Sequence, residues 1–328
     1  MKRFRPFEPL SRNPHVLTVL GNFWPREFDF AAHPSEGRLI RTDPDTQVLV
    51  LTQQPSGTPV GEVVLLHGLE GGGDSGYIVS MAWHALQSGF IVHRFHMRTC
   101  GGTEKLCKTL YHAGLTSDLR AFLEQTVQLQ KARDRRLPVF LIGFSLGGNV
   151  SLKMAGELGE TELIQGVCAI STPIDLAACA RRISRRDNVF YQRRFVSRMK
   201  ARLIGTGRYR ESDFAGVRSV YEIDNRITAP SFGFRDADHY YATQSAMNFL
   251  DKIRVPGLLI QAKDDTFIPF DIFHHPSIAG NPHLTLLATD HGGHVGFLSR
   301  RGPRFWVDEV ALQFVAEIAA RETSVYFR

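Results

Sequence analysis

Short apolar runs alternate with amphipathic stretches along most of the chain. Glycine or polar residues bound each run, which is typical of parallel strands covered on both faces. In the longer stretches apolar residues recur at helical spacing, as Leu119, Phe122, Leu123 and Val127 do. This order predicts an α/β fold in which a mostly parallel central sheet has helices on both faces. The predicted strands are residues 46–51, 62–67, 90–95, 139–142, 164–170, 255–261 and 284–288, and the predicted helices are 78–86, 117–133, 305–321 and one that ends near 158.

Two stretches depart from this alternation. Residues 1–45 contain six prolines, and those at 6, 9, 14, 25 and 34 block long regular elements, which predicts an N-terminal arm packed on the core. Residues 173–238 lack a clear strand pattern and carry helical, arginine-rich sequence, which predicts a cap inserted over the sheet. The segments 46–172 and 239–328 then form the α/β core.

The net charge of +6 in this chain of 328 residues comes from one segment of the predicted cap. Residues 181–210 hold eleven Lys or Arg and one acid, Asp187, while the rest of the chain holds 28 basic and 32 acidic residues. The segment is either a solvated helical face or a surface that meets anionic membranes or acidic substrate head groups. We expect no nucleic-acid partner, because the basic residues are confined to the cap and no nucleic-acid-binding motif is present.

The sequence favours a cytoplasmic protein that meets membranes only peripherally. No apolar run approaches the roughly 18 residues of a membrane span, and the basic start of the chain lacks the apolar region of a secretory signal. The four cysteines form no C-x-x-C pair, which favours reduced thiols. The sequence leaves the oligomeric state open.

The strongest chemical motif is Gly143-Phe-Ser-Leu-Gly147, which follows a buried strand and opens a helix. A serine nucleophile exposed between strand and helix needs a sharp turn with very small neighbours, so glycines two residues away on each side fit that need. The alternative is a glycine-rich turn with an idle serine. The context predicts that Ser145 is a nucleophile.

A serine nucleophile needs a histidine base, and the histidine needs an acid to orient it. Both candidate pairs follow predicted strands and come in the order serine, acid, histidine that this strand–turn–helix motif requires. Asp265 and Asp264 compete for the acid, and we favour Asp265 because it stands four residues before Pro269. His294 and His291 compete for the base, and we favour His294, which lies in a flexible glycine-containing loop.

Two backbone amides are predicted to hold the oxyanion of the tetrahedral intermediate. One is the N–H of Leu146, directly after the nucleophile, and the other is the N–H of Leu69 in the glycine-rich loop 67–73. This loop lacks both nucleotide-binding glycine patterns, and the histidine spacing does not match a helical zinc site, so we expect no cofactor and no metal. The candidate residues of the substrate pocket are His67, Gly68, Glu70 and Phe144.

These motifs together resemble the α/β-hydrolase superfamily of serine esterases, in particular its YheT-like branch. The resemblance covers most of the chain and implies the α/β-hydrolase fold, hydrolysis of carboxylic esters, and the roles given above to Ser145, Asp265 and His294. Thr99 departs from the family, which usually has glycine there. The matching stretches are Arg12-Asn-Pro-His15, His67-Gly-Leu-Glu-Gly71, Gly143-Phe-Ser-Leu-Gly-Gly-Asn149, Asp264-Asp-Thr-Phe-Ile-Pro269 and His291-Gly-Gly-His-Val-Gly-Phe297.

The sequence therefore predicts a serine hydrolase that cleaves carboxylic esters through an acyl-enzyme. The resemblance implies short- or medium-chain acyl esters, acylglycerols or phospholipids as substrates. Two alternatives remain, namely a peptidase or thioesterase that uses the same three residues, and a non-catalytic binding protein on the hydrolase fold.

Overall fold

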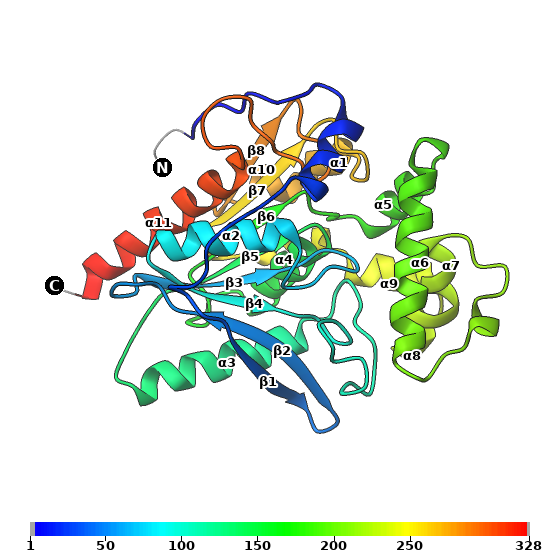
Figure 1. The fold of residues 1–328 in the computed structure, drawn as a ribbon, viewed down its shortest axis with the longest axis horizontal. Helices are drawn as coiled ribbons and strands as arrows, with labels where there is room; N and C mark the ends of the chain where they lie inside the picture. Colours follow the sequence, from blue (N-terminus) through cyan, green and yellow to red (C-terminus); the bar gives the residue numbers. More distant parts are fainter. Residues whose placement is uncertain (1–3, 327–328) are drawn as a thin grey trace.

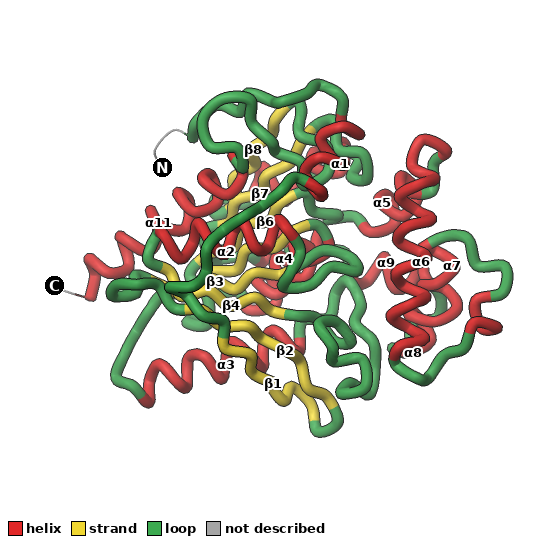
Figure 2. Tube along the Cα trace, in the orientation of Figure 1, coloured by secondary structure: helices red, strands yellow, loops and turns green. Residues whose placement is uncertain are grey.

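A computed structural model describes residues 4–326 and contains one sheet of eight strands (Figures 1 and 2). Each of the strands β3 to β7 is fully buried along its length, which explains why these segments read as continuous apolar runs. The strands are β1 (Glu36–Asp43), β2 (Thr46–Gln53), β3 (Gly61–Leu66), β4 (Phe90–Phe95), β5 (Val139–Phe144), β6 (Gly166–Ile170), β7 (Gly257–Ala262) and β8 (Leu284–Thr289).

The strand order is β1-β2-β4-β3-β5-β6-β7-β8. Strands β3 to β8 are parallel, and β2 is antiparallel to both β1 and β4. The chain passes from β3 to β4 on one side and returns to β5 on the other side of β3. The loops that follow β3 and β5 therefore diverge at the carboxyl ends of the strands, where open α/β sheets bind their ligands.

Helices cover both faces of the sheet, as the sequence predicted. Apolar residues of α2 and α11 pack on one face, and those of α3 and α4 pack on the other (Figure 1). The helices are α1 (Pro14–Phe23), α2 (Gly76–Gln87), α3 (Ser117–Ala132), α4 (Leu146–Leu158), α5 (Leu176–Ile183), α6 (Val189–Gly205), α7 (Val220–Ile223), α8 (Ala229–Ser231), α9 (Ala237–Gln244), α10 (Pro276–Gly280) and α11 (Trp306–Tyr326), with a π-helical turn at Asp224–Thr228 and short 3-10 helices at Arg186–Asn188, Glu211–Phe214, Ala246–Asn248, Leu250–Lys252 and Phe270–His274.

Residues 173–238 are described throughout and contain helices and turns without a strand. In Figure 1, α5 to α8 stand beyond the carboxyl ends of the parallel strands. One face of α6 has its own small core, in which Met199 and Leu203 pack with Phe214 and Ile223. The sequence boundary at residue 238 falls inside α9, which packs on α5.

The described part of the N-terminal arm is more regular than its prolines indicated. Pro14 stands in the first turn of α1, where its missing N–H costs nothing, and the Asn13 side chain accepts hydrogen bonds from the N–H groups of His15 (2.9 Å) and Val16 (3.2 Å). Strand β1 then pairs with β2 at the sheet edge. The arm thus contributes one helix and one strand that the hydrophobic pattern did not predict.

Candidate active site

Ser145 lies at the sharp turn between β5 and α4, with a φ of +52°. The glycines two residues before and after Ser145 are required, because a side chain at either position would clash with the backbone. A Cβ atom on Gly143 would lie 2.3 Å from the carbonyl oxygen of Gly147, and a Cβ atom on Gly147 would lie 2.4 Å from that of Leu66. The start of α4 is thereby pressed against the end of β3, which leaves the Ser145 side chain at the carboxyl edge of the sheet.

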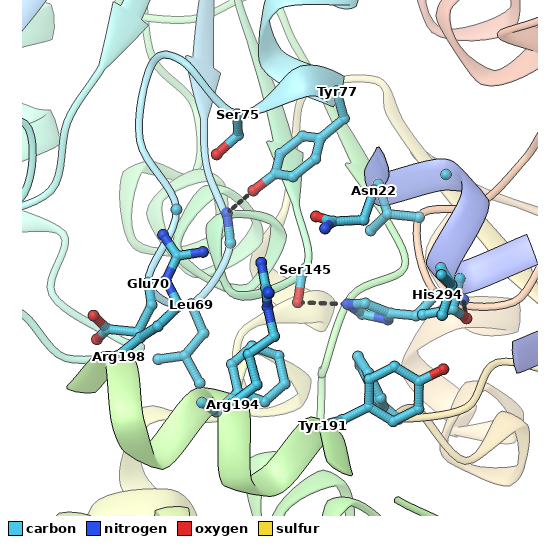
Figure 3. A pocket seen from close by; sticks show the side chains of 18 of the residues that line it. Asn22, Leu69, Glu70, Ser75, Tyr77, Ser145, Tyr191, Arg194, Arg198 and His294 are labelled. Carbon is cyan, nitrogen blue, oxygen red and sulfur yellow. Dashed lines mark hydrogen bonds between the residues drawn. The ribbon is translucent and has the colours of Figure 1, made fainter. Parts of the chain in front are cut away.

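His294 links Ser145 to Asp265 through both ring nitrogens. Its Nε2 lies 3.0 Å from Ser145 Oγ (Figure 3). Its Nδ1 lies 3.0 and 3.1 Å from the two carboxylate oxygens of Asp265. Asp265 Oδ1 also accepts hydrogen bonds from the N–H groups of Phe267 (2.8 Å) and Ile268 (3.0 Å). These bonds fix the carboxylate, and a fixed carboxylate fixes the orientation of the imidazole.

The neighbouring aspartate binds the other histidine. Asp264 Oδ2 lies 3.1 Å from His291 Nδ1, and Asp264 Oδ1 accepts a hydrogen bond of 2.9 Å from Gly293 N–H. Adjacent residues point in different directions, so each aspartate bonds to its own histidine. The structure places Asp265 and His294 at Ser145, while Asp264 and His291 hold the loop that carries His294.

Helix α1 also supports this loop, which sequence reasoning missed. The His294 N–H donates to Thr18 Oγ1 (2.9 Å), and Thr18 Oγ1 in turn donates to the Pro14 carbonyl (2.7 Å). The dipeptide Asn13-Pro14 is a helix-start signal that could have indicated α1. No local signal could have indicated that Thr18 contacts a residue 276 positions away.

The amides of Leu69 and Leu146 donate no hydrogen bond to any residue that the structure describes. Their neighbours are fixed, because Gly68 N–H donates to Tyr77 Oη (2.9 Å) and Glu70 N–H donates to Tyr111 Oη (3.0 Å). The two tyrosines thus hold the loop after β3 from both sides of Leu69. Neither tyrosine was singled out from the sequence.

Two cavities meet at Ser145, and both are bordered by Ser145, His294 and Leu69. The outer cavity lies between α1, the loop after β3 and α6 (Figure 3). The inner cavity extends between the cap and the core, and its wall is mostly apolar. Two of its polar members bond to each other, since Tyr241 donates a hydrogen bond of 2.6 Å to Asp224. The apolar wall includes Leu146, Leu176, Ile183, Met199, Val220 and Ile268.

Two of the four predicted pocket residues do not line these cavities. Gly68 and Glu70 line the outer cavity, whereas His67 and Phe144 are fully buried behind it. His67 Nδ1 donates to the Gly68 carbonyl (2.8 Å) and its Nε2 accepts from Met97 N–H (3.2 Å), and burial lowers its pKa to about 4. Both side chains therefore support the wall from behind, because the sheet covers them.

Glu70 forms a buried ion pair with Arg202 of the cap helix α6, at 2.9 Å. Arg202 Nη1 also donates to Thr99 Oγ1 (2.8 Å), and Tyr111 donates to Glu70 (3.1 Å). Burial alone would lower the pKa of Arg202, but the Glu70 charge raises it above its usual value. Thr99 has a φ of +60°, which glycine would adopt more easily, and its hydroxyl supplies the bond to Arg202 that glycine lacks. This network ties the cap to the loop after β3.

Removing one partner of this pair is expected to destabilise the fold strongly. Arg202→Met or Glu70→Gln leaves a buried charge without its partner, so each should lower the free energy of unfolding in urea by about 3–5 kcal/mol. The double variant should lose less than the sum of the two. Arg193→Met, at an exposed arginine of the same helix, serves as the control and should change stability by less than about 0.5 kcal/mol. Additive single effects would contradict this coupling.

The fold, the turn at Ser145 and the hydrogen-bonded series Ser145–His294–Asp265 are those of an alpha/beta hydrolase. Residues 63–306 match the model of the alpha/beta hydrolase family, and the chain belongs to that family. A relative from Escherichia coli (strain K12), the inferred esterase YheT, is 30% identical over 315 residues, which cover 93% of this chain and 90% of the relative. The resemblance to the YheT-like branch is thereby confirmed.

Other similar proteins have names of the esterase and lipase type. The monoacylglycerol lipase of Saccharomyces cerevisiae is 28% identical over 267 residues, which cover 77% of this chain and 58% of that relative. Among solved structures, the Pyrococcus furiosus esterase Pf2001 has a TM-score of 0.57 at 18% identity and covers 96% of this chain and 98% of its own, which shows a shared fold. The chain is therefore an alpha/beta hydrolase of the esterase and lipase type.

Two further findings concern metals and membranes. Within residues 4–326, no three His, Cys, Asp or Glu side chains are grouped so that they could hold a metal ion. No helix in the same range is both long and apolar enough to span a bilayer.

Proposed function

We propose that the protein hydrolyses carboxylic esters through an acyl-enzyme on Ser145. The observation that carries the proposal is the 3.0 Å contact between Ser145 Oγ and His294 Nε2, beside an apolar cavity. Ser145 Oγ attacks the acyl carbonyl carbon and gives its proton to His294 Nε2, while Asp265 holds the Nδ1–H. The N–H groups of Leu69 and Leu146 hold the oxyanion.

The intermediate collapses when the bond between the acyl carbon and the alcohol oxygen breaks. His294 gives its proton to the departing alcohol, then takes a proton from a water molecule that attacks the acyl-enzyme. The acid leaves and Ser145 regains its proton. Every proton passes through Nε2 of one imidazole, so the cycle needs no cofactor.

The inner cavity suits a short or medium acyl chain. Its aliphatic wall removes such a chain from water, which contributes about 0.8 kcal/mol per buried CH₂ group. The yeast relative named monoacylglycerol lipase supports acylglycerols as one substrate class. A peptidase or thioesterase would use the same three side chains, so only turnover separates these activities.

A panel of substrates tests the proposal. It contains p-nitrophenyl esters from acetate to dodecanoate, aminoacyl p-nitroanilides and acyl-CoA thioesters, with a fluorophosphonate probe to label the nucleophile. We expect ester hydrolysis with the highest kcat/KM at a short or medium chain, and loss of all activity once Ser145 is labelled. Faster turnover of anilides or thioesters would favour the alternative enzymes, and an unlabelled, inactive protein would favour a binding role.

We also propose that the rim of the outer cavity contacts lipid surfaces. Five of the nine exposed large apolar side chains in residues 4–322 lie on α1 (Val16, Val19, Phe23) or at the start of α6 (Val189, Phe190). His15 of α1 stacks on Tyr191 of α6, with ring centroids 5.8 Å apart, so the two helices present these side chains together. Basic residues of α6 flank the rim, which suits anionic lipid.

Vesicle binding should depend on this rim. Phe23 is 63% and Phe190 78% exposed, so the double variant Phe23→Ser/Phe190→Ser is expected to bind vesicles at least about tenfold more weakly than wild type. Leu129→Ser, at an exposed leucine on α3, is the control. Co-sedimentation with vesicles with and without phosphatidylglycerol measures the effect. Equal binding of all three proteins, or no preference for anionic vesicles, would contradict the proposal.

A further inference from the structure

Three arginines stand four residues apart along α6, and only the last is neutralised. Arg202 is paired with Glu70 and its side chain is 9% exposed. Arg194 and Arg198 line the outer cavity and are exposed, and neither forms an ion pair with any carboxylate in residues 4–326. Arg194 lies over the Phe23 ring at 5.2 Å, a contact that leaves its charge uncompensated. The cavity next to Ser145 therefore has an excess of two positive charges.

The two unpaired guanidinium groups repel each other, and a bound anion would reduce this repulsion. Like charges four residues apart on a helix repel each other. Figure 3 shows Arg194 and Arg198 extending from α6 toward the side of the cavity where Ser145 lies. The single acid in the cavity wall, Glu70, is already engaged by Arg202. No carboxylate of the outer wall thus competes with an incoming anion.

In the proposed reaction, the two cavities hold different parts of the ester. With the acyl chain in the mostly apolar inner cavity, the alcohol side extends into the outer cavity, because both cavities border Ser145. Guanidinium groups bind phosphate through paired, charge-assisted hydrogen bonds. Building on the proposed ester hydrolysis, we propose that the preferred substrate is an acyl ester whose alcohol carries a phosphate group, bound by Arg194 and Arg198.

The phosphate takes no part in bond breaking. The bond between the acyl carbon and the alcohol oxygen breaks as described above, and the phosphate leaves with the released alcohol. Arg194 and Arg198 determine specificity through binding and do not touch the reacting atoms. Their removal should therefore affect phosphorylated and neutral esters differently.

A pair of matched esters tests the assignment kinetically. The substrates are 1-octanoylglycerol 3-phosphate and 1-octanoylglycerol, both below the concentrations at which they form micelles. In wild type we expect kcat/KM at least about tenfold higher for the phosphate ester, because charge-assisted bonds contribute this much or more. Arg194→Gln/Arg198→Gln should reduce the ratio of the two kcat/KM values about 10- to 100-fold, because the loss falls mainly on the phosphate ester.

The control removes the same net charge elsewhere on the cap. Arg181→Gln/Arg193→Gln replaces two exposed arginines outside both cavities and should keep the wild-type ratio. A wild-type ratio of one or less would overturn the inference. An equal fall of the ratio in both double variants would also overturn it, since the effect would then be general charge steering.

A binding measurement separates this inference from the proposed hydrolysis. The ether 1-O-octylglycerol 3-phosphate cannot be hydrolysed, and calorimetry should show that it binds wild type at least about tenfold more tightly than 1-O-octylglycerol or inorganic phosphate. This difference should disappear in Arg194→Gln/Arg198→Gln. If wild type binds the phosphate ether more tightly while no ester is hydrolysed, the proposed function fails and the anion site stands. If neutral esters are hydrolysed and the difference is absent, or inorganic phosphate binds equally well, the proposed preference for phosphate esters fails while the proposed hydrolysis stands.

Discussion

Replacing Ser145 with alanine is expected to lower kcat on the best p-nitrophenyl ester by about 10⁶-fold if Ser145 is the proposed nucleophile, because removal of the nucleophile has an effect of this size in serine hydrolases. Alanine leaves His294 and Asp265 without an oxygen to activate. The substitution adds no atom at the crowded turn, so the free energy of unfolding should stay within about 0.5 kcal/mol of wild type. Steady-state kinetics and urea unfolding on the same preparations measure both effects.

Ser75 provides a matched control for this result. Its hydroxyl lines the same outer cavity and accepts a hydrogen bond of 3.0 Å from Gly72 N–H. Ser75→Ala should change kcat by less than about tenfold, because this hydroxyl has no base beside it. Esterase activity in Ser145→Ala within about tenfold of wild type would contradict the assignment of the nucleophile.

The second large effect is expected from Asp265→Asn, which should lower kcat by about 10⁴-fold. An asparagine amide donates to His294 Nδ1 and so favours the tautomer that carries its proton on Nε2. That tautomer cannot accept the Ser145 proton. The asparagine oxygen can still accept from Phe267 N–H and Ile268 N–H, so the loop should keep its conformation.

Asp264→Asn is the matched control, because it makes the same chemical change one residue away. Asp264 bonds to His291 and Gly293 N–H, so this variant should lose less than about tenfold in kcat. Comparable losses in the two variants would mean that both aspartates act by holding the loop. A larger loss in Asp264→Asn would exchange their roles.

Local sequence patterns indicated much of the fold before any contact was known. The apolar run 139–142 predicted β5, which ends directly before the turn of Ser145. Buried parallel strands must be apolar along their whole length, and a strand-to-helix turn this tight excludes Cβ atoms at Gly143 and Gly147. Such requirements act within a few residues, so they can be predicted from the local sequence.

Features that depend on contacts between distant segments could not be predicted from local sequence patterns. The prolines of the arm concealed α1 and β1, because a proline in the first turn of a helix starts it and a short edge strand leaves little pattern. His67 stood in the right loop but points away from the cavity. The sequence also could not separate Arg202, which is buried and paired, from Arg194 and Arg198, which face the cavity.

By itself, the sequence determined the parallel strands of the sheet, the serine at its turn, and the order in which an acid and a histidine follow. The tertiary structure decided which aspartate meets which histidine, which helix supports the histidine loop, and which arginines of α6 remain unpaired. The reason is that periodicity and turn geometry depend on neighbours along the chain. Hydrogen bonds between residues such as Thr18 and His294, or Glu70 and Arg202, depend on how distant segments pack.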